Sequence, residues 1–146
     1  MQFQGTVSIN APQKKVWQFL TDADFVAKCA PGVESLEIIE PNKKFHAVAS
    51  IGLGNIKARF ATDVEWIELE EPNRAKVKAH GTAPGSATDV IAEMFLQEKG
   101  EQTEMTWKAD ITVMGTIASL ASRMMGSVTE KLTTQFFECV KSKIEE

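Results

Sequence analysis

Apolar and polar residues alternate one by one along most of this chain, which is the pattern of β-strands with one buried face. In the clearest run, residues 55–69, every second side chain from Ile56 to Trp66 is uncharged, and most of those between them are charged. A first strand is predicted near the N-terminus, where Phe3, Val7 and Ile9 alternate with polar residues. Six more strands are predicted over 33–40, 44–51, 55–69, 74–82, 87–97 and 102–113.

Two short helices are predicted between the first strand and the second. Asn10 is expected to cap the first, with Pro12 in its first turn. Asp22 is expected to cap the second, which runs to about Ala30 and is stopped by Pro31-Gly32.

The last segment changes to helical periodicity. From Thr116 to about Ile144, apolar residues recur at three-to-four spacing and no proline interrupts them. Such a helix is roughly 40 Å long, and only a broad sheet can cover its apolar stripe. We therefore expect one domain over residues 1–146, of the α+β class, with a seven-stranded antiparallel sheet wrapped around the C-terminal helix in the order β-α-α-β6-α.

The turns between the predicted strands alternate in chemistry. The turns at 40–44, 70–74 and 98–101 are charged, whereas those at 52–55, 82–86 and 114–116 are uncharged and contain glycine. In an antiparallel meander, successive turns fall at opposite ends of the sheet. The uncharged end is therefore predicted to be the mouth of an apolar cavity, formed by Pro31, Gly32, Gly52, Leu53, Gly54, Pro84, Gly85, Met114 and Gly115. Leu53→Asp is expected to weaken uptake of an apolar ligand with little effect on stability, as for an exposed loop residue.

Composition excludes several function classes. The net charge is −4 and no cluster of Lys and Arg suggests nucleic-acid binding. The N-terminus lacks the features of a signal peptide, and no apolar stretch approaches the roughly 20 residues of a transmembrane helix. Cys29 and Cys139 lie in apolar helical contexts without metal-ligand spacing, so buried free thiols and a reducing cytoplasm are expected.

The inward-facing positions predict binding rather than catalysis. None of those on the three clearest strands is ionisable, so no general acid–base pair, metal site or cofactor site is expected. His46 and His80 stand alone, and the facing of Asp89 and Glu93 stays open. All five internal Met residues lie after residue 93, and methionine lines adaptable apolar surfaces. The predicted ligand-lining residues are Phe60, Val64, Trp66, Val77, Met94, Met105, Trp107, Ile111, Leu120, Met124 and Val128.

The order of elements and several local motifs resemble the carbon monoxide dehydrogenase G-subunit family of the START/Bet v 1-like (SRPBCC) helix-grip superfamily. The motifs are Asn10-Ala11-Pro12 with Val16-Trp17 and Leu20, Cys29-Ala30-Pro31-Gly32-Val33 with Leu36, Ile56–Phe60, the run Trp107–Leu120, and Phe136-Phe137 before Val140-Lys141. The resemblance covers nearly the whole chain. It implies a curved sheet that grips the C-terminal helix over an apolar cavity.

The resemblance also implies partners. It implies association with a molybdenum hydroxylase-type dehydrogenase and a role at the inner face of the membrane. Some members carry a C-terminal extension that can anchor them, and because this sequence ends at Glu146 we expect only transient membrane-surface contact. The favoured function is a non-enzymatic accessory protein that binds a hydrophobic small molecule, such as a quinone or a lipid. The alternatives are an enzyme of the polyketide cyclase or hydratase type, and a docking or maturation factor that binds no ligand.

Overall fold

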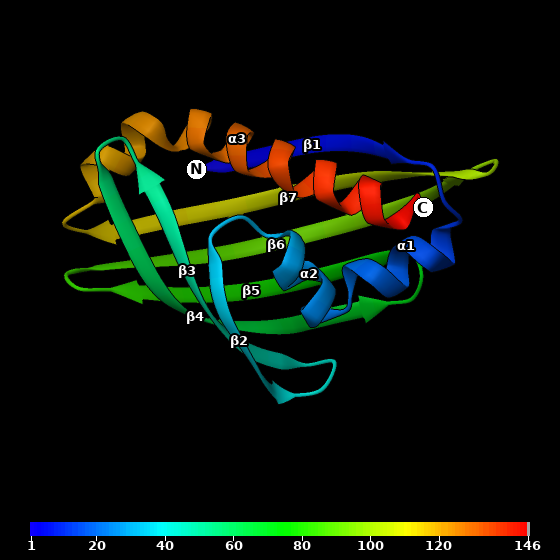
Figure 1. Ribbon diagram of the computed structural model, residues 1–146, viewed down its shortest axis with the longest axis horizontal. Helices are drawn as coiled ribbons and strands as arrows, with labels where there is room; N and C mark the ends of the chain where they lie inside the picture. Colours follow the sequence, from blue (N-terminus) through cyan, green and yellow to red (C-terminus); the bar gives the residue numbers. More distant parts are fainter. Residues whose placement is uncertain (146) are drawn as a thin grey trace.

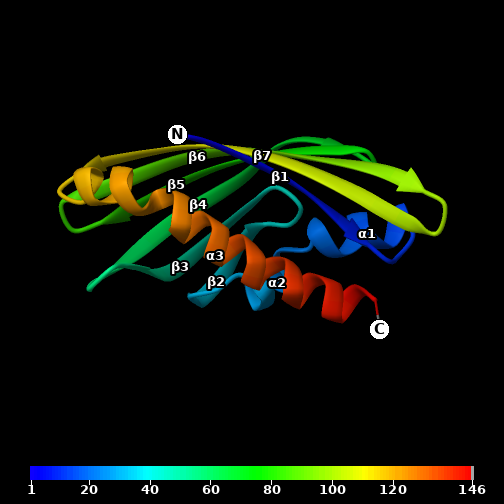
Figure 2. The same cartoon turned by 90° about the horizontal axis from the view of Figure 1, so that it is seen from above.

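The computed structural model describes residues 1–145 as one curved sheet that wraps around a long helix (Figures 1 and 2). The elements in chain order are β1 (Gln2–Ile9), α1 (Gln13–Leu20), α2 (Ala23–Cys29), β2 (Val33–Glu40), β3 (Lys44–Leu53), β4 (Ile56–Glu70), β5 (Arg74–Ala83), β6 (Ser86–Lys99), β7 (Gln102–Gly115) and α3 (Ala118–Ile144). The expected element order and architecture are confirmed.

The sheet is antiparallel throughout, with the order β1-β7-β6-β5-β4-β3-β2. Strands β2 to β7 form an uninterrupted meander, so their turns alternate between the two ends of the sheet. Figure 1 shows the β3–β4, β5–β6 and β7–α3 connections at one end of the molecule. We call this the glycine end, and the end with the β2–β3, β4–β5 and β6–β7 turns the charged end.

The helix caps differ in part from expectation. Asp22 caps α2 as predicted, because its side chain accepts a hydrogen bond from the Asp24 N–H at 3.0 Å. The expected cap at Asn10 is wrong: α1 begins at Gln13 after Pro12, and the Asn10 backbone N–H donates to Glu145 at the end of α3 instead. Asn10 therefore links the two chain ends.

The core lies at the charged end, where α1, α2 and the last turns of α3 pack against the sheet. Ile9, Val16, Val140 and Ile144 are fully buried there. In contrast, Ala121 is the only fully buried residue in the first twenty-two positions of α3, up to Cys139. The same inner face of the sheet is thus filled at one end and loosely covered at the other.

The expectation of free thiols is wrong, because Cys29 at the end of α2 forms a disulfide with Cys139 of α3. The bond spans 110 residues and ties the C-terminal half of α3 to the core. Disulfides persist mainly in oxidising compartments, so the cysteines do not support the expected reducing cytoplasm. Within residues 1–145, no helix combines the length and the apolar character needed to cross a membrane.

Candidate functional site

An apolar cavity of about 340 Å³ lies at the glycine end, between the sheet and the N-terminal half of α3. We call it the interior cavity. Its volume is at the lower end of the range for small-molecule sites. Its lining residues are Ile51, Leu53, Phe60, Thr88, Val90, Trp107, Ala109, Ile111, Val113, Ile117, Ala121, Met125, Val128, Thr129, Leu132 and Thr133.

Small residues occur near the interior cavity on both the sheet and the helix. Gly81 is buried on β5, between Thr62 of β4 and Thr88 of β6. A side chain at Gly81 would meet Thr62, Thr88 and Phe60 at 3.0–3.4 Å. On α3, the fully buried Ala121 borders the cavity.

The cavity wall is almost entirely apolar. Among the described residues, no ionisable side chain lines it, and its only hydroxyl groups belong to three threonines. The Thr88 hydroxyl donates to Thr112 O at 3.1 Å, and the Thr133 hydroxyl donates to Thr129 O at 2.8 Å. Two of the three hydroxyl protons are thus already used within the protein.

Four of the eleven predicted lining residues border the interior cavity. They are Phe60, Trp107, Ile111 and Val128. The other seven do not, because their positions lie too far from the glycine end or on the flank of α3. Val64 and Val77 lie on the middle of the inner face, Met94 and Met105 pack with the core, Trp66 lines a different pocket, and Leu120 and Met124 lie beside the cavity-facing stripe of α3.

On α3, the predicted lining residue Val128 borders the cavity, whereas Leu120 and Met124 lie one position away from the residues that do, Ala121 and Met125. The stripe runs through Ile117, Ala121, Met125, Val128 and Leu132. Met125 therefore faces the cavity where Met124 was predicted. Met124 instead lies over the β3–β4 turn, within 3.3 Å of the position that a Gly54 side chain would take.

The predicted mouth residues gather at the glycine end, with one correction. The β5–β6 and β7–α3 turns touch, since a side chain at Gly115 would collide with Gly85 O and both glycines have positive φ. Pro31-Gly32 lies against β3, where Ser50 N–H donates to Gly32 O at 2.8 Å. Leu53 is not an exposed loop residue: it is only 3% exposed and forms part of the cavity wall. Gly52 has open space around it, and Pro84 and Met114 flank the touching turns.

The facing of Asp89 and Glu93 is settled by the register of β6. Val90 between them lines the cavity, and both carboxylates lie on the outer face. Asp89 accepts a hydrogen bond from His80 at 2.6 Å, and Glu93 pairs with Arg74 at 3.3 Å. The Arg74 guanidinium also donates to Glu70, and this hydrogen bond raises the pKa of Arg74.

His46 and His80, which looked isolated in the sequence, belong to one row across the outer face. The register places them in the order His46, Asp63, His80, Asp89 across β3 to β6. His46 and Asp63 are 2.8 Å apart. No group of three or more such side chains in residues 1–145 is arranged to hold a metal ion.

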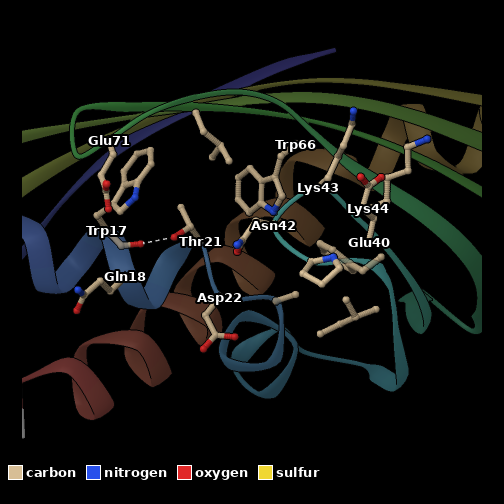
Figure 3. A pocket seen from close by; sticks show the side chains of 15 residues that line it. Trp17, Gln18, Thr21, Asp22, Glu40, Asn42, Lys43, Lys44, Trp66 and Glu71 are labelled. Carbon is tan, nitrogen blue, oxygen red and sulfur yellow. Dashed lines mark hydrogen bonds between the residues drawn. The ribbon is translucent and has the colours of Figure 1, made fainter.

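A second pocket, of about 610 Å³, lies at the charged end between α1–α2 and the β2–β3 hairpin (Figure 3). We call it the aromatic groove. It shares no lining residue with the interior cavity. Its lining residues are Trp17, Gln18, Thr21, Asp22, Ala23, Ile38, Glu40, Pro41, Asn42, Lys43, Lys44, Phe45, Trp66, Leu69 and Glu71.

Several solved structures share this architecture over almost their entire length. A conserved protein from Geobacillus kaustophilus is 25% identical, with a TM-score of 0.91 over 99% of this chain and 95% of that one. The aromatase/cyclase Zhui from Streptomyces sp. R1128 (18% identity, TM-score 0.76, 99% and 93% covered) and a START superfamily protein from Mycobacterium smegmatis (11%, 0.73, 99% and 97%) share the fold. Comparison with curated proteins found no match.

The family comparison covers nearly every element described above. The family model of the carbon monoxide dehydrogenase G subunit (CoxG) matches residues 5–145, from β1 to the end of α3. The seven-stranded antiparallel sheet and the long C-terminal helix are those of the Bet v 1-like helix-grip fold. The helix-grip fold implies a hydrophobic ligand cavity, and the chain belongs to the CoxG family.

Proposed function

We propose that this protein is a non-enzymatic carrier that holds the hydrocarbon part of a quinone- or lipid-like molecule in the interior cavity. The observation that carries the proposal is the wall of sixteen residues without an ionisable side chain. A hydrocarbon chain gains about 25 cal/mol for each Å² that it buries in such a wall. A polar group entering it would lose hydrogen bonds to water and find few in return.

The same wall argues against the cyclase or hydratase alternative. General acid–base catalysis needs a His or a carboxylate within hydrogen-bond reach of the substrate. The nearest candidates on β6, Asp89 and Glu93, face away from the cavity and are paired with His80 and Arg74. The fold shared with the Zhui aromatase/cyclase does not transfer its chemistry, because fold does not fix function.

We further propose that the ligand enters at the glycine end. Leu53 and Ile117 border the cavity there, and Met124 lies beside them over the β3–β4 turn. The turns at this end carry no charge, so an apolar ligand or a membrane surface approaches without desolvating ions. Transient contact with a membrane through this end would allow exchange of the ligand.

The proposed partner is a molybdenum-containing dehydrogenase of the carbon monoxide dehydrogenase type. The support is the description of the family to which the chain belongs. Calorimetric titration of such a dehydrogenase with the ligand-loaded protein should give saturable binding. If no binding is seen, the proposed partner is wrong, and the carrier function is unaffected.

Ligand binding is tested by native mass spectrometry with dodecanoate and two adjacent variants of α3. Val128 lines the cavity, and Ser127 is exposed. Val128→Trp should fill the cavity and abolish the one-to-one complex, whereas Ser127→Trp adds the same side chain outside the cavity and should leave it intact. Equal binding by both variants, or no complex with the natural protein, would refute the proposal.

A further inference from the structure

The geometry points to a second binding site, in the aromatic groove, for a neutral planar ring that carries carbonyl oxygens. This site is separate from the interior cavity and does not depend on the function proposed for it. Three features of the groove indicate such a ligand: its walls, its unused hydrogen-bond donors and the placement of its charges.

The walls of the groove are aromatic and partly uncovered. Figure 3 shows the ring of Trp17, from α1, at one side of the pocket and that of Trp66, from β4, near its middle; Trp17 is buried, at 5% exposure. Phe45, Ile38 and Leu69 complete the apolar lining, and Ile38 and Leu69 are 45% and 43% exposed. Large apolar side chains left this open around a pocket of about 610 Å³ are suited to cover a flat ring.

The backbone fixes Asn42 between these walls. Pro41 and Asn42 occupy the centre of a turn that is closed by the Lys43 N–H donating to Glu40 O at 3.0 Å. Asn42 has a positive φ of 61°, a conformation that asparagine tolerates better than most residues. The Trp66 N–H donates to Lys43 O at 2.8 Å and so ties the turn to β4. Figure 3 shows the Asn42 carboxamide beside the Trp66 ring, on the side of Thr21.

The groove offers hydrogen-bond donors that the protein does not use. Among the described residues, neither the indole N–H of Trp17 or Trp66 nor the Asn42 carboxamide forms a hydrogen bond. Neither indole nitrogen is among the buried side-chain atoms of residues 1–145 that lack a hydrogen bond, so neither is sealed from solvent. An indole can only donate a hydrogen bond, so the matching ligand group is an acceptor oxygen.

The charges around the groove disfavour an anionic ligand. The lining includes two lysines and three carboxylates. In Figure 3 the ammonium groups of Lys43 and Lys44 point away from the space between the tryptophans, and Asp22 points away on the opposite side. An anion between the rings would meet no cation there, because the carboxylate on the Trp17 side is that of Glu71 (Figure 3). A ring with carbonyl oxygens meets both the aromatic walls and the free donors.

The test uses duroquinone and durene, which share the methylated ring and differ in the two carbonyl oxygens. The chain has three tryptophans, so its ¹H–¹⁵N spectrum contains three indole signals. Duroquinone should shift the Trp17 and Trp66 signals with saturation, and durene should bind at least about five-fold more weakly for each hydrogen bond lost. Dodecanoate should shift the Trp107 signal instead, because Trp107 lines the interior cavity.

Two variants locate the site. Asn42→Gly keeps the positive φ and removes the carboxamide, and it should weaken duroquinone binding about five-fold. Val128→Trp fills the interior cavity and should leave duroquinone binding unchanged. The proposal is overturned if duroquinone does not bind, if it binds no better than durene, or if it shifts only the Trp107 signal and is lost in Val128→Trp. The last result would leave the carrier function standing.

Discussion

Leu53 was expected to be an exposed turn residue, but its side chain is buried in the cavity wall. It lies at the end of β3 and is 3% exposed, whereas its cross-strand partner Ile56 is 49% exposed. Leu53→Ala should lower the free energy of unfolding by about 2–3 kcal/mol, the low end for such a change, because the wall already borders open space.

The matched control is Ile56→Ala, which should change the free energy of unfolding by no more than about 0.5 kcal/mol. Urea unfolding of both variants decides the point. Equal, small effects would show that Leu53 is as exposed as Ile56. Leu53→Asp, which looks harmless in the sequence, should for the same reason be strongly destabilising.

Gly5 and Gly52 form a second pair of matched positions. A side chain at Gly5 of β1 would lie 2.8 Å from the indole nitrogen of Trp107, whereas one at Gly52 meets nothing within 4 Å. Gly5→Ala should push Trp107 toward the cavity and cost about 1–3 kcal/mol. Thermal unfolding and the Trp107 indole signal measure the two effects. Gly52→Ala should leave both unchanged, and a similar response in the two variants would contradict the contact.

Among the elements, β2 is an edge strand that depends on one carboxylate. Glu34 accepts hydrogen bonds from Ser50 at 2.6 Å and Arg59 at 3.0 Å, and these lower its pKa. A lowered pKa means that the ionised form stabilises the fold above the ordinary pKa of glutamate, and that this stabilisation is lost as the pH falls through the lowered value.

Hydrogen exchange of β2 should therefore speed up selectively at acidic pH. In Glu34→Gln, exchange of β2 should already be fast at neutral pH and should lose this acid dependence. A β2 segment whose relative protection is the same at both pH values would contradict the role of Glu34.

The two halves of α3 should differ in mobility. Val140 and Ile144 are fully buried and Cys139 is bonded to Cys29, whereas residues 122–134 contain no buried side chain. Amides of 122–134 should exchange faster than those of 136–144, and dodecanoate should slow the first group only. Uniform protection along α3, or a ligand effect confined to 136–144, would contradict a cavity under the N-terminal half of the helix.

The elements themselves were predictable because local patterns determine them. The alternation of residues 55–69 places β4 to within one residue at each end, and turn chemistry separates the two ends of the sheet. Asn10 was misassigned because α1 begins only at Gln13, with Pro12 at the cap position; its backbone N–H instead donates to Glu145, 135 residues away, and no local pattern signals such a partner. A β-bulge between Trp66 and Glu68 likewise interrupts the alternation near the groove.

Across the molecule as a whole, the sequence could not show which end of the inner face is hollow. Val64, Val77 and Met94 face inward as predicted, but the core fills the charged end and confines the interior cavity to the glycine end. The Cys29–Cys139 bond depends on the packing of α2 against α3, which sequence spacing does not reveal. The aromatic groove depends on five elements, α1, α2, β2, β3 and β4, that meet only in the fold.

The proposed function depends above all on an apolar ligand lying between the sheet and the N-terminal half of α3. Photolabelling with a fatty acid that carries a diazirine at its terminal carbon, followed by peptide mapping, locates that ligand directly. We predict label on residues 117–133 of the helical segment or 107–113 of β7, with loss of label in Val128→Trp and its retention in Ser127→Trp. Label on residues 17–23 or 38–45 around the aromatic groove, or no saturable label, would contradict this placement.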